Sequence, residues 1–412
     1  MTKKTKTLLV RVAVFVLVLL LVAAIYFVLS GRYNRLQMAS NLFSGAEQYE
    51  NFNRVYELFP SAEVPASSTP YPFEKSPQIE LPQSYEYSGM QQSTEQFLTD
   101  TDTSALLVLK DGNIVFEEYW LTGGQDVQWL SMSVAKSVVA TLIGIAVEEG
   151  AINSIEDPIT KYVSQLEGSA YDGVRIKDIL QMSSGARWNE DYSDFNSDVN
   201  RFGRIFALGG SMNEFVRGLE RELDPGSYNR YNSADTQALG MMLVTATGET
   251  ISEYTRTRLW EPMGAEASTY WLLDNDGMEM AFGGLNATAR DYAKIGELYR
   301  LGGKVNGLQI VPQSWVRDAT TPDAPHLYPG DNENSDNPFG YGYQWWVLEG
   351  NQGEYSAIGV YNQFIYVNPS AGTVIVKLSA NSDYGVTLEE KSYREHESFE
   401  LFRAIVATLR KD

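Results

Sequence analysis

The feature that most constrains this chain is a lysine followed directly by a long run without charge. Lys136 precedes residues 137–147 (SVVATLIGIAV), which are hydrophobic nearly all round. A helix that is apolar on every side is buried in a large core, and lysine is seldom buried without a partner. Ser133 lies three residues earlier, and residues three apart share one face of a helix. The sequence therefore predicts a buried helix that holds an amine beside a hydroxyl.

This placement predicts an amine that loses its proton readily. Burial and the positive end of the helix both disfavour an ammonium group at Lys136. The chain has no cysteine and only two histidines, His326 and His396. Both lie in polar or charged segments, so we expect them at the solvated surface. A Cys–His nucleophile is excluded and a Ser–His–Asp triad is disfavoured, which favours a Ser–Lys pair. The alternative is a lysine that extends from the helix end to solvent.

Composition limits the kinds of partner. The 412 residues are 43% hydrophobic and 12% aromatic, as in a folded globular protein. A formal net charge of −21 argues against a nucleic-acid partner. Without cysteine the fold needs no disulfide, so an oxidising compartment is tolerated. No phosphate-binding glycine loop or zinc motif is present in the sequence, and we expect neither metal nor cofactor.

The N-terminus predicts a membrane anchor. Lysines at positions 3, 4 and 6 precede an unbroken apolar run over 12–29, which as a helix spans roughly 27 Å, close to the thickness of the hydrocarbon core. The basic residues favour a cytoplasmic tail over 1–7, a transmembrane anchor over 8–30 and a catalytic region outside the cytoplasm. A cleaved signal peptide is the alternative, and it exports the remainder equally.

The remaining chain predicts an α+β fold. Residues 31–88 are mixed and Pro/Ser-rich in part, and we interpret them as a stalk or wrapping segment before a domain over 89–412. Two β-rich ends enclose a mostly helical lobe over about 151–300, which predicts one antiparallel sheet built from both ends and flanked by helices, with a cleft between sheet and lobe. The expected strands are 105–110, 113–116, 341–348, 355–360, 364–367 and 373–378, and the expected helices are 176–182, 213–219, 235–245, 289–299 and 388–409.

Five phrases in order carry a family resemblance. The chain is similar to the serine hydrolases that include class C β-lactamases, D-Ala-D-Ala carboxypeptidases and esterases, and within them to the 6-aminohexanoate-dimer hydrolase branch. The resemblance covers about residues 90–405 and implies a β-lactamase/DD-peptidase-like fold. The phrases are 130–137 (LSMSVAKS), 180–185 (LQMSSG), 231–236 (YNSADT), 283–291 (GGLNATARD) and 340–346 (GYGYQWW).

The resemblance implies three catalytic residues. Ser133 is the expected nucleophile and Lys136 takes or relays its proton. Tyr231 is the expected second general base and acid, a role that needs its phenol pKa lowered by a nearby ammonium. Tyr231 follows a Pro-Gly turn and precedes the helix expected over 235–245, so a loop carries it toward the cleft.

Four further residues are expected on the substrate side. Tyr192 is a candidate hydrogen-bond donor, with a packed aromatic lid as the alternative. Ser233 stands where the family has an amide that often orients substrate and lysine. Gly359 allows close approach to its strand, and the N–H of Val360, together with that of Ser133, is expected to form an oxyanion hole.

One departure from the family bears on the substrate. The third family motif begins with Lys or His, whereas this chain has Ala357, so the cation that holds a substrate carboxylate is missing. We therefore expect a membrane-anchored hydrolase of a small amide or ester. The alternatives are a D-alanyl carboxypeptidase or β-lactamase, an esterase without amide substrates, and a non-catalytic penicillin-binding or envelope scaffold.

Overall fold

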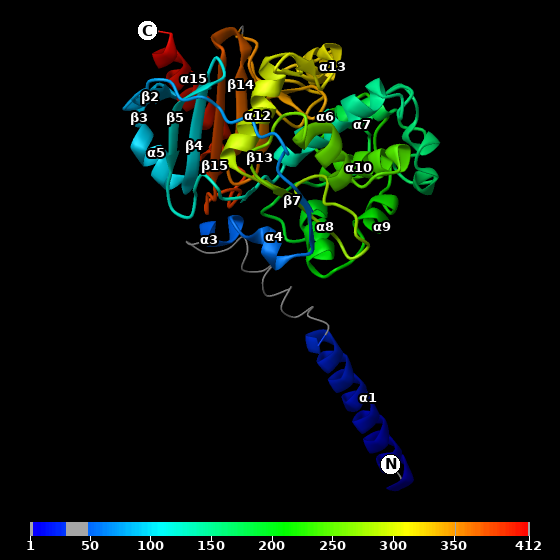
Figure 1. Ribbon diagram of the computed structural model, residues 1–412. Helices are drawn as coiled ribbons and strands as arrows, with labels where there is room; N and C mark the ends of the chain where they lie inside the picture. The colour runs from blue at the N-terminus through cyan, green and yellow to red at the C-terminus, as the bar shows by residue number, and fades with distance from the viewer. Residues whose placement is uncertain (1–2, 30–47, 351, 411–412) are drawn as a thin grey trace.

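A seven-stranded antiparallel sheet forms the centre of the molecule (Figure 1). The computed structural model describes residues 3–29, 48–350 and 352–410. The strand order is β11-β12-β13-β14-β15-β4-β5, so β15 pairs with β4 and joins the two ends of the catalytic region, as predicted. The strands are β4 (Thr103–Lys110), β5 (Asn113–Tyr119), β11 (Gly340–Tyr341), β12 (Trp346–Val347), β13 (Tyr355–Gly359), β14 (Gln363–Asn368) and β15 (Thr373–Ser379).

Side chains of the central strands alternate between two hydrophobic cores. Leu107 and Leu109 of β4 belong to one core, whereas Leu106 and Val108 belong to the other. Successive residues of a strand point to opposite faces, so a strand without polar alternation is covered on both sides. This explains why the expected strands contain near-continuous apolar residues.

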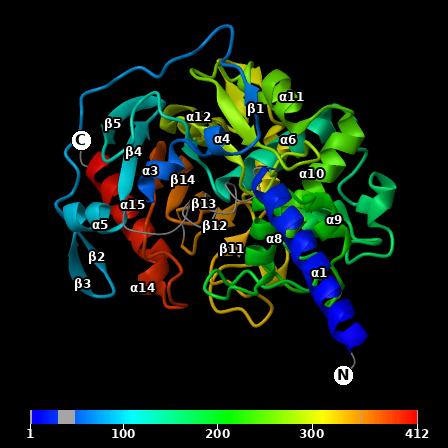
Figure 2. The same cartoon turned by 90° about the horizontal axis from the view of Figure 1, so that it is seen from below.

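Helices cover both faces of the sheet. The helix α12 (Ala289–Arg300) packs on β14, β15 and β4, and α6 (Val134–Glu148) reaches β13 and β14 on the same side. The helix α15 (Glu395–Leu409) covers the other face, where Phe399 and Phe402 contact Phe364 and Tyr366. In Figure 2, α15 lies to one side of β11–β14 and the helices α8–α10 lie to the other.

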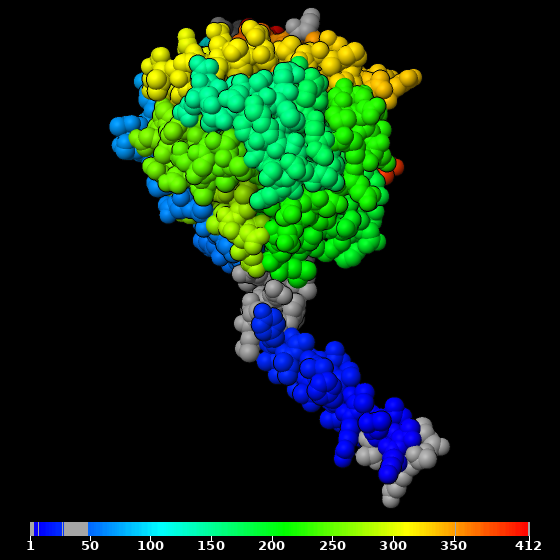
Figure 3. Space-filling view, turned by 90° about the vertical axis from the view of Figure 1, so that its right-hand side faces the viewer, coloured from blue at the N-terminus to red at the C-terminus, as the bar shows by residue number. Residues whose placement is uncertain are grey.

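The lobe between the two halves of the sheet is mostly helical but has strands of its own. A second sheet has the order β1-β7-β8-β6 and runs antiparallel throughout. Figure 3 shows the face that this lobe presents, in teal and green. The elements are α7 (Ile176–Leu180), α8 (Asp198–Ala207), α9 (Met212–Arg217), α10 (Ser233–Thr247), α11 (Ile251–Thr255), β6 (Trp129–Leu130), β7 (Thr269–Leu272) and β8 (Leu285–Ala287).

Residues 48–88 wrap around this body. The strand β1 (Ser61–Val64) pairs with β7, and Phe52, Val55 and Val64 are buried in the core of the domain. Part of the expected stalk, residues 31–47, lies outside the described residues. The remaining described elements here and beyond are α3 (Tyr49–Phe52), α4 (Val55–Leu58), β2 (Ser84–Tyr87), β3 (Met90–Ser93), α5 (Thr94–Asp100), β9 (Lys304–Val305), β10 (Leu308–Gln309), α13 (Gln313–Ala319) and α14 (Glu390–Tyr393), with short 3₁₀ turns at Ile159–Lys161, Ser164–Leu166, Pro325–Leu327 and Pro369–Ala371 and a π turn at Arg256–Trp260.

Two expected elements are interrupted. The strand expected over 341–348 is two short strands, because Gln344 has a φ of 60° and turns the chain between them. The helix expected over 388–409 divides into α14 and α15 at Arg394, whose φ is 54°. A non-glycine residue in the left-handed region breaks either periodic structure.

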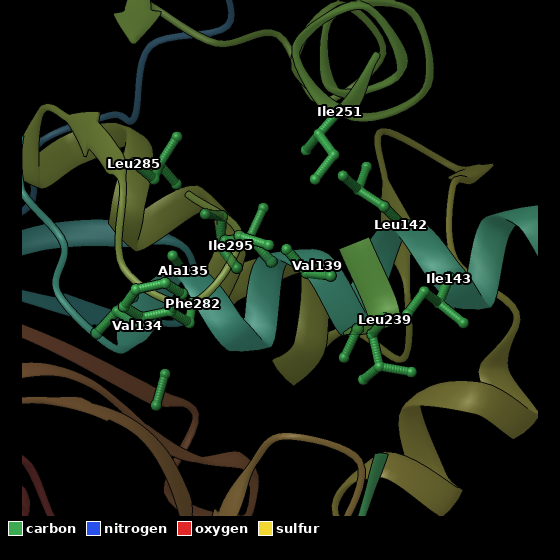
Figure 4. Close-up of a cluster of buried hydrophobic side chains, with 14 of the residues drawn as sticks. Val134, Ala135, Val139, Leu142, Ile143, Leu239, Ile251, Phe282, Leu285 and Ile295 are labelled. Carbon is green, nitrogen blue, oxygen red and sulfur yellow. The ribbon is translucent and has the colours of Figure 1, made fainter. Parts of the chain in front are cut away.

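The predicted buried helix is confirmed. In α6 every residue from Val134 to Ala146 is buried. Figure 4 shows Val139, Leu142 and Ile143 of α6 among Leu239 of α10 and other apolar side chains from the helical lobe.

The N-terminal helix α1 (Lys3–Leu29) is long and apolar enough to cross a membrane. Its apolar window has a mean hydropathy of 3.1, and none of that window is buried against protein. Both a membrane anchor and a signal sequence have these properties.

Candidate active site

Ser133 stands at the N-terminal cap of α6, after a tight turn. Met132 has a φ of 47°, a conformation that costs energy in a non-glycine residue. The Ser131 N–H donates to the Leu285 carbonyl at 2.8 Å, which ties the turn to the second sheet. The Ser133 side chain makes no capping hydrogen bond to its own helix. Ser133 lines the cavity described below.

Lys136 lies one turn into α6, with its amine against the Ser133 hydroxyl. The Nζ–Oγ distance is 2.7 Å. Two other oxygens surround the amine, the Ser233 hydroxyl at 3.1 Å and the Phe282 carbonyl at 3.0 Å. The side chain is 1% exposed. The predicted adjacency of residues 133 and 136 is thus present, and the alternative of a lysine that extends to solvent is wrong.

Burial lowers the pKa of Lys136 from 10.5 to about 8, although the negative charge of Glu190 acts in the opposite direction. A buried amine loses hydration that it needs in its charged form more than in its neutral form. A usable fraction of neutral amine therefore exists near neutral pH, and this fraction grows as pH rises through about 8.

Tyr231 lies next to the same amine. Lys136 Nζ is 4.9 Å from the centre of the Tyr231 ring, and the ring stacks on Trp346 with their centres 5.0 Å apart. Burial raises the pKa of Tyr231 well above its usual value, with a further rise from Glu190, while a hydrogen bond with Ser133 lowers it. The expectation of a lowered phenol pKa is wrong, because burial disfavours a phenolate and the negative charge of Glu190 disfavours it further. The Tyr231 side chain is a phenol at neutral pH.

Glu190 joins the site through Ser233. The Ser233 hydroxyl donates to Glu190 Oε1 at 2.7 Å and its N–H donates to Oε2 at 3.1 Å. The Tyr192 hydroxyl donates to Oε1 at 2.7 Å, and the Trp188 indole N–H donates to Oε2. Ser233 is buried between Lys136 and this carboxylate. The expected substrate contact of Ser233 stays a prediction, since its hydroxyl is occupied inside the protein.

A cavity of about 530 Å³ opens above Ser133. Its walls are mainly aromatic, and five carboxylates also face it. Arg230 is the only lysine or arginine among its described lining residues, and this side chain is paired with Glu222 and Asp336. The lining includes Tyr192, Tyr231, Trp346, Val360 and Tyr384, together with the acidic residues Glu190, Asp191, Asp336, Glu390 and Glu395.

The loop after β13 approaches Ser133 through a glycine. A Cβ at Gly359 would lie 2.6 Å from the Ser131 carbonyl oxygen and 3.0 Å from Met132 Cβ. The glycine therefore makes room for the protein's own turn, whereas we expected it to make room for substrate. Val360 follows it and lines the cavity. Asn362 has a φ of 65°, in the left-handed region that asparagine adopts more readily than most other residues.

The histidines differ from their predicted exposure. His326 is buried, with its Nε2 3.1 Å from Ser183 Oγ. His396 is half-buried and lines the cavity, with its ring centre 4.4 Å from that of Phe339. The polar neighbours of both residues in sequence led to the wrong expectation, because packing between distant segments decides burial. Among residues 3–29, 48–350 and 352–410, no group of three His, Cys, Asp or Glu side chains is arranged to hold a metal ion.

Sequence reasoning missed Glu190 and Phe282. Glu190 belongs to the segment 188–192, in which only Tyr192 drew attention, and a carboxylate beside a candidate substrate residue was the available signal. No sequence signal pointed to the Phe282 carbonyl, because a backbone oxygen has no identity in sequence. Both groups reach Lys136 or its partner from remote parts of the chain.

Comparisons with known proteins agree with this geometry. Residues 90–398 match the family model described as Beta-lactamase. A 6-aminohexanoate-dimer hydrolase of Paenarthrobacter ureafaciens is 32% identical over 340 residues, which are 81% of this chain and 85% of the relative.

Two solved structures show the same fold. One, from Bacillus anthracis and assigned by its name to 6-aminohexanoate-dimer hydrolases, has a TM-score of 0.80 at 23% identity and covers 90% of this chain and 96% of its own. A penicillin binding protein from Bacillus halodurans has a TM-score of 0.55 at 18% identity and covers 76% of this chain and 99% of its own. The chain belongs to the beta-lactamase family and is a serine hydrolase of that fold.

Proposed function

We propose that this hydrolase cleaves amide or ester bonds through an acyl-enzyme on Ser133, with Lys136 as the general base. The observation that carries the proposal is the buried Lys136 amine 2.7 Å from the Ser133 hydroxyl. Neutral Lys136 accepts the hydroxyl proton as Oγ forms a bond to the substrate carbonyl carbon, which places a negative charge on the carbonyl oxygen. The N–H groups of Ser133 and Val360 are the proposed donors to that oxygen.

Tyr231 is the proposed route of the proton to the leaving group. As the tetrahedral intermediate collapses, the C–N or C–O bond breaks and the leaving amine or alcohol takes the proton of the Tyr231 phenol. The Lys136 ammonium then gives its own proton to the Tyr231 oxygen. The high pKa of the Tyr231 phenol supports this role, because a phenol that retains its proton is available as a donor. Water then attacks the acyl-enzyme and gives a proton to neutral Lys136. As the second tetrahedral intermediate collapses, the bond between the carbonyl carbon and Oγ breaks, Oγ takes that proton from Lys136, and the acid product leaves.

The proposed substrate is a small amide or ester without a carboxylate near the scissile bond. Ala357 is buried on β13, and Arg230 is held by two carboxylates, so the described cavity wall offers no unpaired cation. An anionic group would meet five acidic side chains there, of which Glu390 and Glu395 have a pKa that burial raises to about 7. This disfavours a D-alanyl carboxypeptidase or β-lactamase, whose substrates carry such a group. The name of the Paenarthrobacter relative supports a linear amide.

The proposed location is the outer side of a membrane, with α1 as a single-pass anchor and 89–412 as the catalytic domain. The apolar helix α1 and the lysines at positions 3, 4 and 6 support this orientation. The boundaries at 7, 30 and 88 belong to the same proposal.

A labelling experiment tests the nucleophile. A fluorophosphonate probe is applied to the wild type, to Ser133→Ala and to Lys136→Met. We expect strong labelling of the wild type, none of Ser133→Ala and slow labelling of Lys136→Met, since the probe reacts only with an activated hydroxyl. Equal labelling of wild type and Ser133→Ala would refute the mechanism and favour a non-catalytic envelope protein.

Substrate panels then separate the remaining classes. The rates of hydrolysis of a p-nitrophenyl ester, a linear 6-aminohexanoate dimer and nitrocefin are compared in the same preparations. We expect turnover of the ester and the linear amide and none of nitrocefin. Turnover of the ester alone would restrict the enzyme to esterase activity, and fast turnover of nitrocefin would contradict the argument from Ala357.

A further inference from the structure

The hydrogen bonds around Glu190 have a definite direction. This carboxylate accepts from the Ser233 hydroxyl and the Tyr192 hydroxyl at Oε1, and from the Ser233 N–H and the Trp188 indole N–H at Oε2. A carboxylate has about four lone-pair sites, so these four donors fill it. The Ser233 hydroxyl proton is therefore committed to Glu190.

The direction of the hydrogen bond from Ser233 to Glu190 determines whether Ser233 donates to Lys136 or accepts from it. A hydroxyl carries one proton, so once that proton points to Glu190 the oxygen only accepts from Lys136 Nζ, 3.1 Å away. The Phe282 carbonyl, 3.0 Å from the same nitrogen, is also only an acceptor. A neutral amine has two hydrogens and one lone pair. Its two hydrogens go to Ser233 and Phe282, and its lone pair is left for the third neighbour, the Ser133 hydroxyl at 2.7 Å.

The same three contacts suit both protonation states of the lysine. When the Ser133 proton moves onto Nζ, the ammonium has three hydrogens for the three oxygens around it. No rotation of the Lys136 side chain is needed during proton transfer. Preorganised groups of this kind lower the cost of reaching the transition state.

We propose that Glu190 is a positioning residue that acts through Ser233 to turn the lone pair of neutral Lys136 toward the Ser133 hydroxyl. The inference rests on the proposed function of Ser133 and Lys136. It assigns Ser233 a role in directing the base, and the substrate contact of Ser233 stays a prediction.

Glu190→Gln reverses this hydrogen-bond chain with little change of shape. The Gln amide nitrogen cannot occupy the Oε2 position, which faces two N–H donors, so it takes the Oε1 position and donates to the Ser233 oxygen. Ser233 then donates to Lys136, and its proton competes with that of Ser133 for the amine lone pair. General-base catalysis contributes about 10²–10⁴-fold, so we expect kcat for a p-nitrophenyl ester to fall about 10²-fold with KM within about twofold.

Two further measurements distinguish this effect from a structural one. Loss of the Glu190 charge removes an influence that raises the pKa of Lys136, so the midpoint of the pH–kcat/KM profile is expected to move to lower pH. Ser233→Ala is expected to lower kcat about as much, and Glu190→Gln in a Ser233→Ala background is expected to add less than about twofold. Glu220→Gln, at a side chain that is 76% exposed and does not line the cavity, is the matched control and is expected to equal the wild type.

The outcomes separate this inference from the proposed function. Unchanged kcat and an unmoved pH midpoint in Glu190→Gln, with fluorophosphonate labelling of the wild type intact, would overturn only the role of Glu190. Additive losses in the double variant would overturn the route through Ser233. If Glu190→Gln does not fold, wild-type kcat in a folded Ser233→Ala would overturn the inference. A wild type that does not label would instead overturn the proposed function itself.

Discussion

At the scale of residues, the proposed chemistry depends on one buried amine. Lys136 is deprived of water on a helix that offers no carboxylate in its first turn. Its three neighbours are neutral oxygens, and the nearest charge, Glu190, acts through Ser233. An ion pair with direct contact would have kept the amine charged. Because the Ser233 hydroxyl separates Lys136 from Glu190, the pKa of Lys136 can be lowered while the orientation of its amine stays defined.

The first prediction concerns pH. Because burial lowers the pKa of Lys136 to about 8, the neutral amine increases as pH rises through that value. We expect kcat/KM for a neutral ester to rise from about pH 6 to a plateau above about pH 9, with a midpoint near 8. Lys136→Arg, which stays charged, is expected to lose at least about 10²-fold at all these pH values. A wild-type profile that is flat over this range would contradict the assignment of the base.

The second prediction concerns a lysine outside the site. Lys377 on β15 is fully buried, with its Nζ 2.5 Å from Ser379 Oγ. Burial lowers the pKa of Lys377 well below 10.5. The unfolded chain therefore binds more protons than the folded protein between the lowered pKa and 10.5, so this lysine makes stability increase with pH across that window.

Lys377→Met should remove the free-energy cost of burying this amine. Methionine has no ammonium group that must lose its hydration on folding, so we expect the free energy of unfolding at pH 7 to rise and to depend less on pH. Urea unfolding at pH 7 and 9 measures both effects. Lys391→Met, at a side chain that is 75% exposed, is the control and should change stability little. A less stable Lys377→Met protein would show that this lysine is favourable where it lies.

At the scale of elements, the active site depends on how closely β13 approaches the start of α6. Gly359 ends β13 against Ser131 and Met132, and the following loop brings Val360 to the cavity. A glycine is required here because even a methyl group would overlap a backbone oxygen. The strand and the turn that carries Ser133 are thereby held at one fixed separation.

Gly359→Ala tests this contact. The added Cβ should push the strand away from the turn and move Val360 relative to Ser133. Misplacement of this size costs about 10–100-fold in rate, and we expect such a loss in kcat together with lower thermal stability. Gly203→Ala is the matched control, because a Cβ within α8 at that position meets nothing within 4 Å. It should raise stability by up to about 1 kcal/mol and leave kcat unchanged. Wild-type kcat in Gly359→Ala would contradict the argument.

Several elements were predictable because their signals are local. The hairpin β4–β5 turns at Asp111 and Gly112, whose φ values of 49° and 82° suit that dipeptide. The helices α10 and α12 lie where periodicity placed them. The second sheet was not predicted, because its strands are only two to four residues long. One of them, β1, is remote in sequence from its partner β7. Pairing over such separations leaves no local pattern.

At the scale of the whole molecule, the anchor and the domain should be separable. The apolar window of α1 buries none of its surface on the domain, so we expect the domain to fold without it. We expect deletion of residues 1–30 to move the protein from the membrane fraction to the soluble fraction with kcat/KM for an ester within about twofold. Fractionation and the ester assay measure this. A truncated protein that still sediments with membranes would show that another surface binds lipid.

What the sequence determined by itself follows from short-range chemistry. The spacing of Ser133 and Lys136, the uncharged run after them and the Asp-Gly turn are local, and each required a particular structure. The family phrases added Tyr231, which spacing alone could not select among 25 tyrosines. These features were enough for the α+β fold and for the Ser–Lys pair.

The tertiary structure decided what surrounds that pair. Glu190, Ser233 and the Phe282 carbonyl meet at or near one nitrogen from three separate segments, and His326 is buried in spite of its polar neighbours. The pKa of Lys136 and Tyr231 depends on desolvation, and desolvation is the sum of contacts from the whole fold. No window of sequence contains that sum, so the pKa values of Lys136 and Tyr231 could be judged only from the packed molecule.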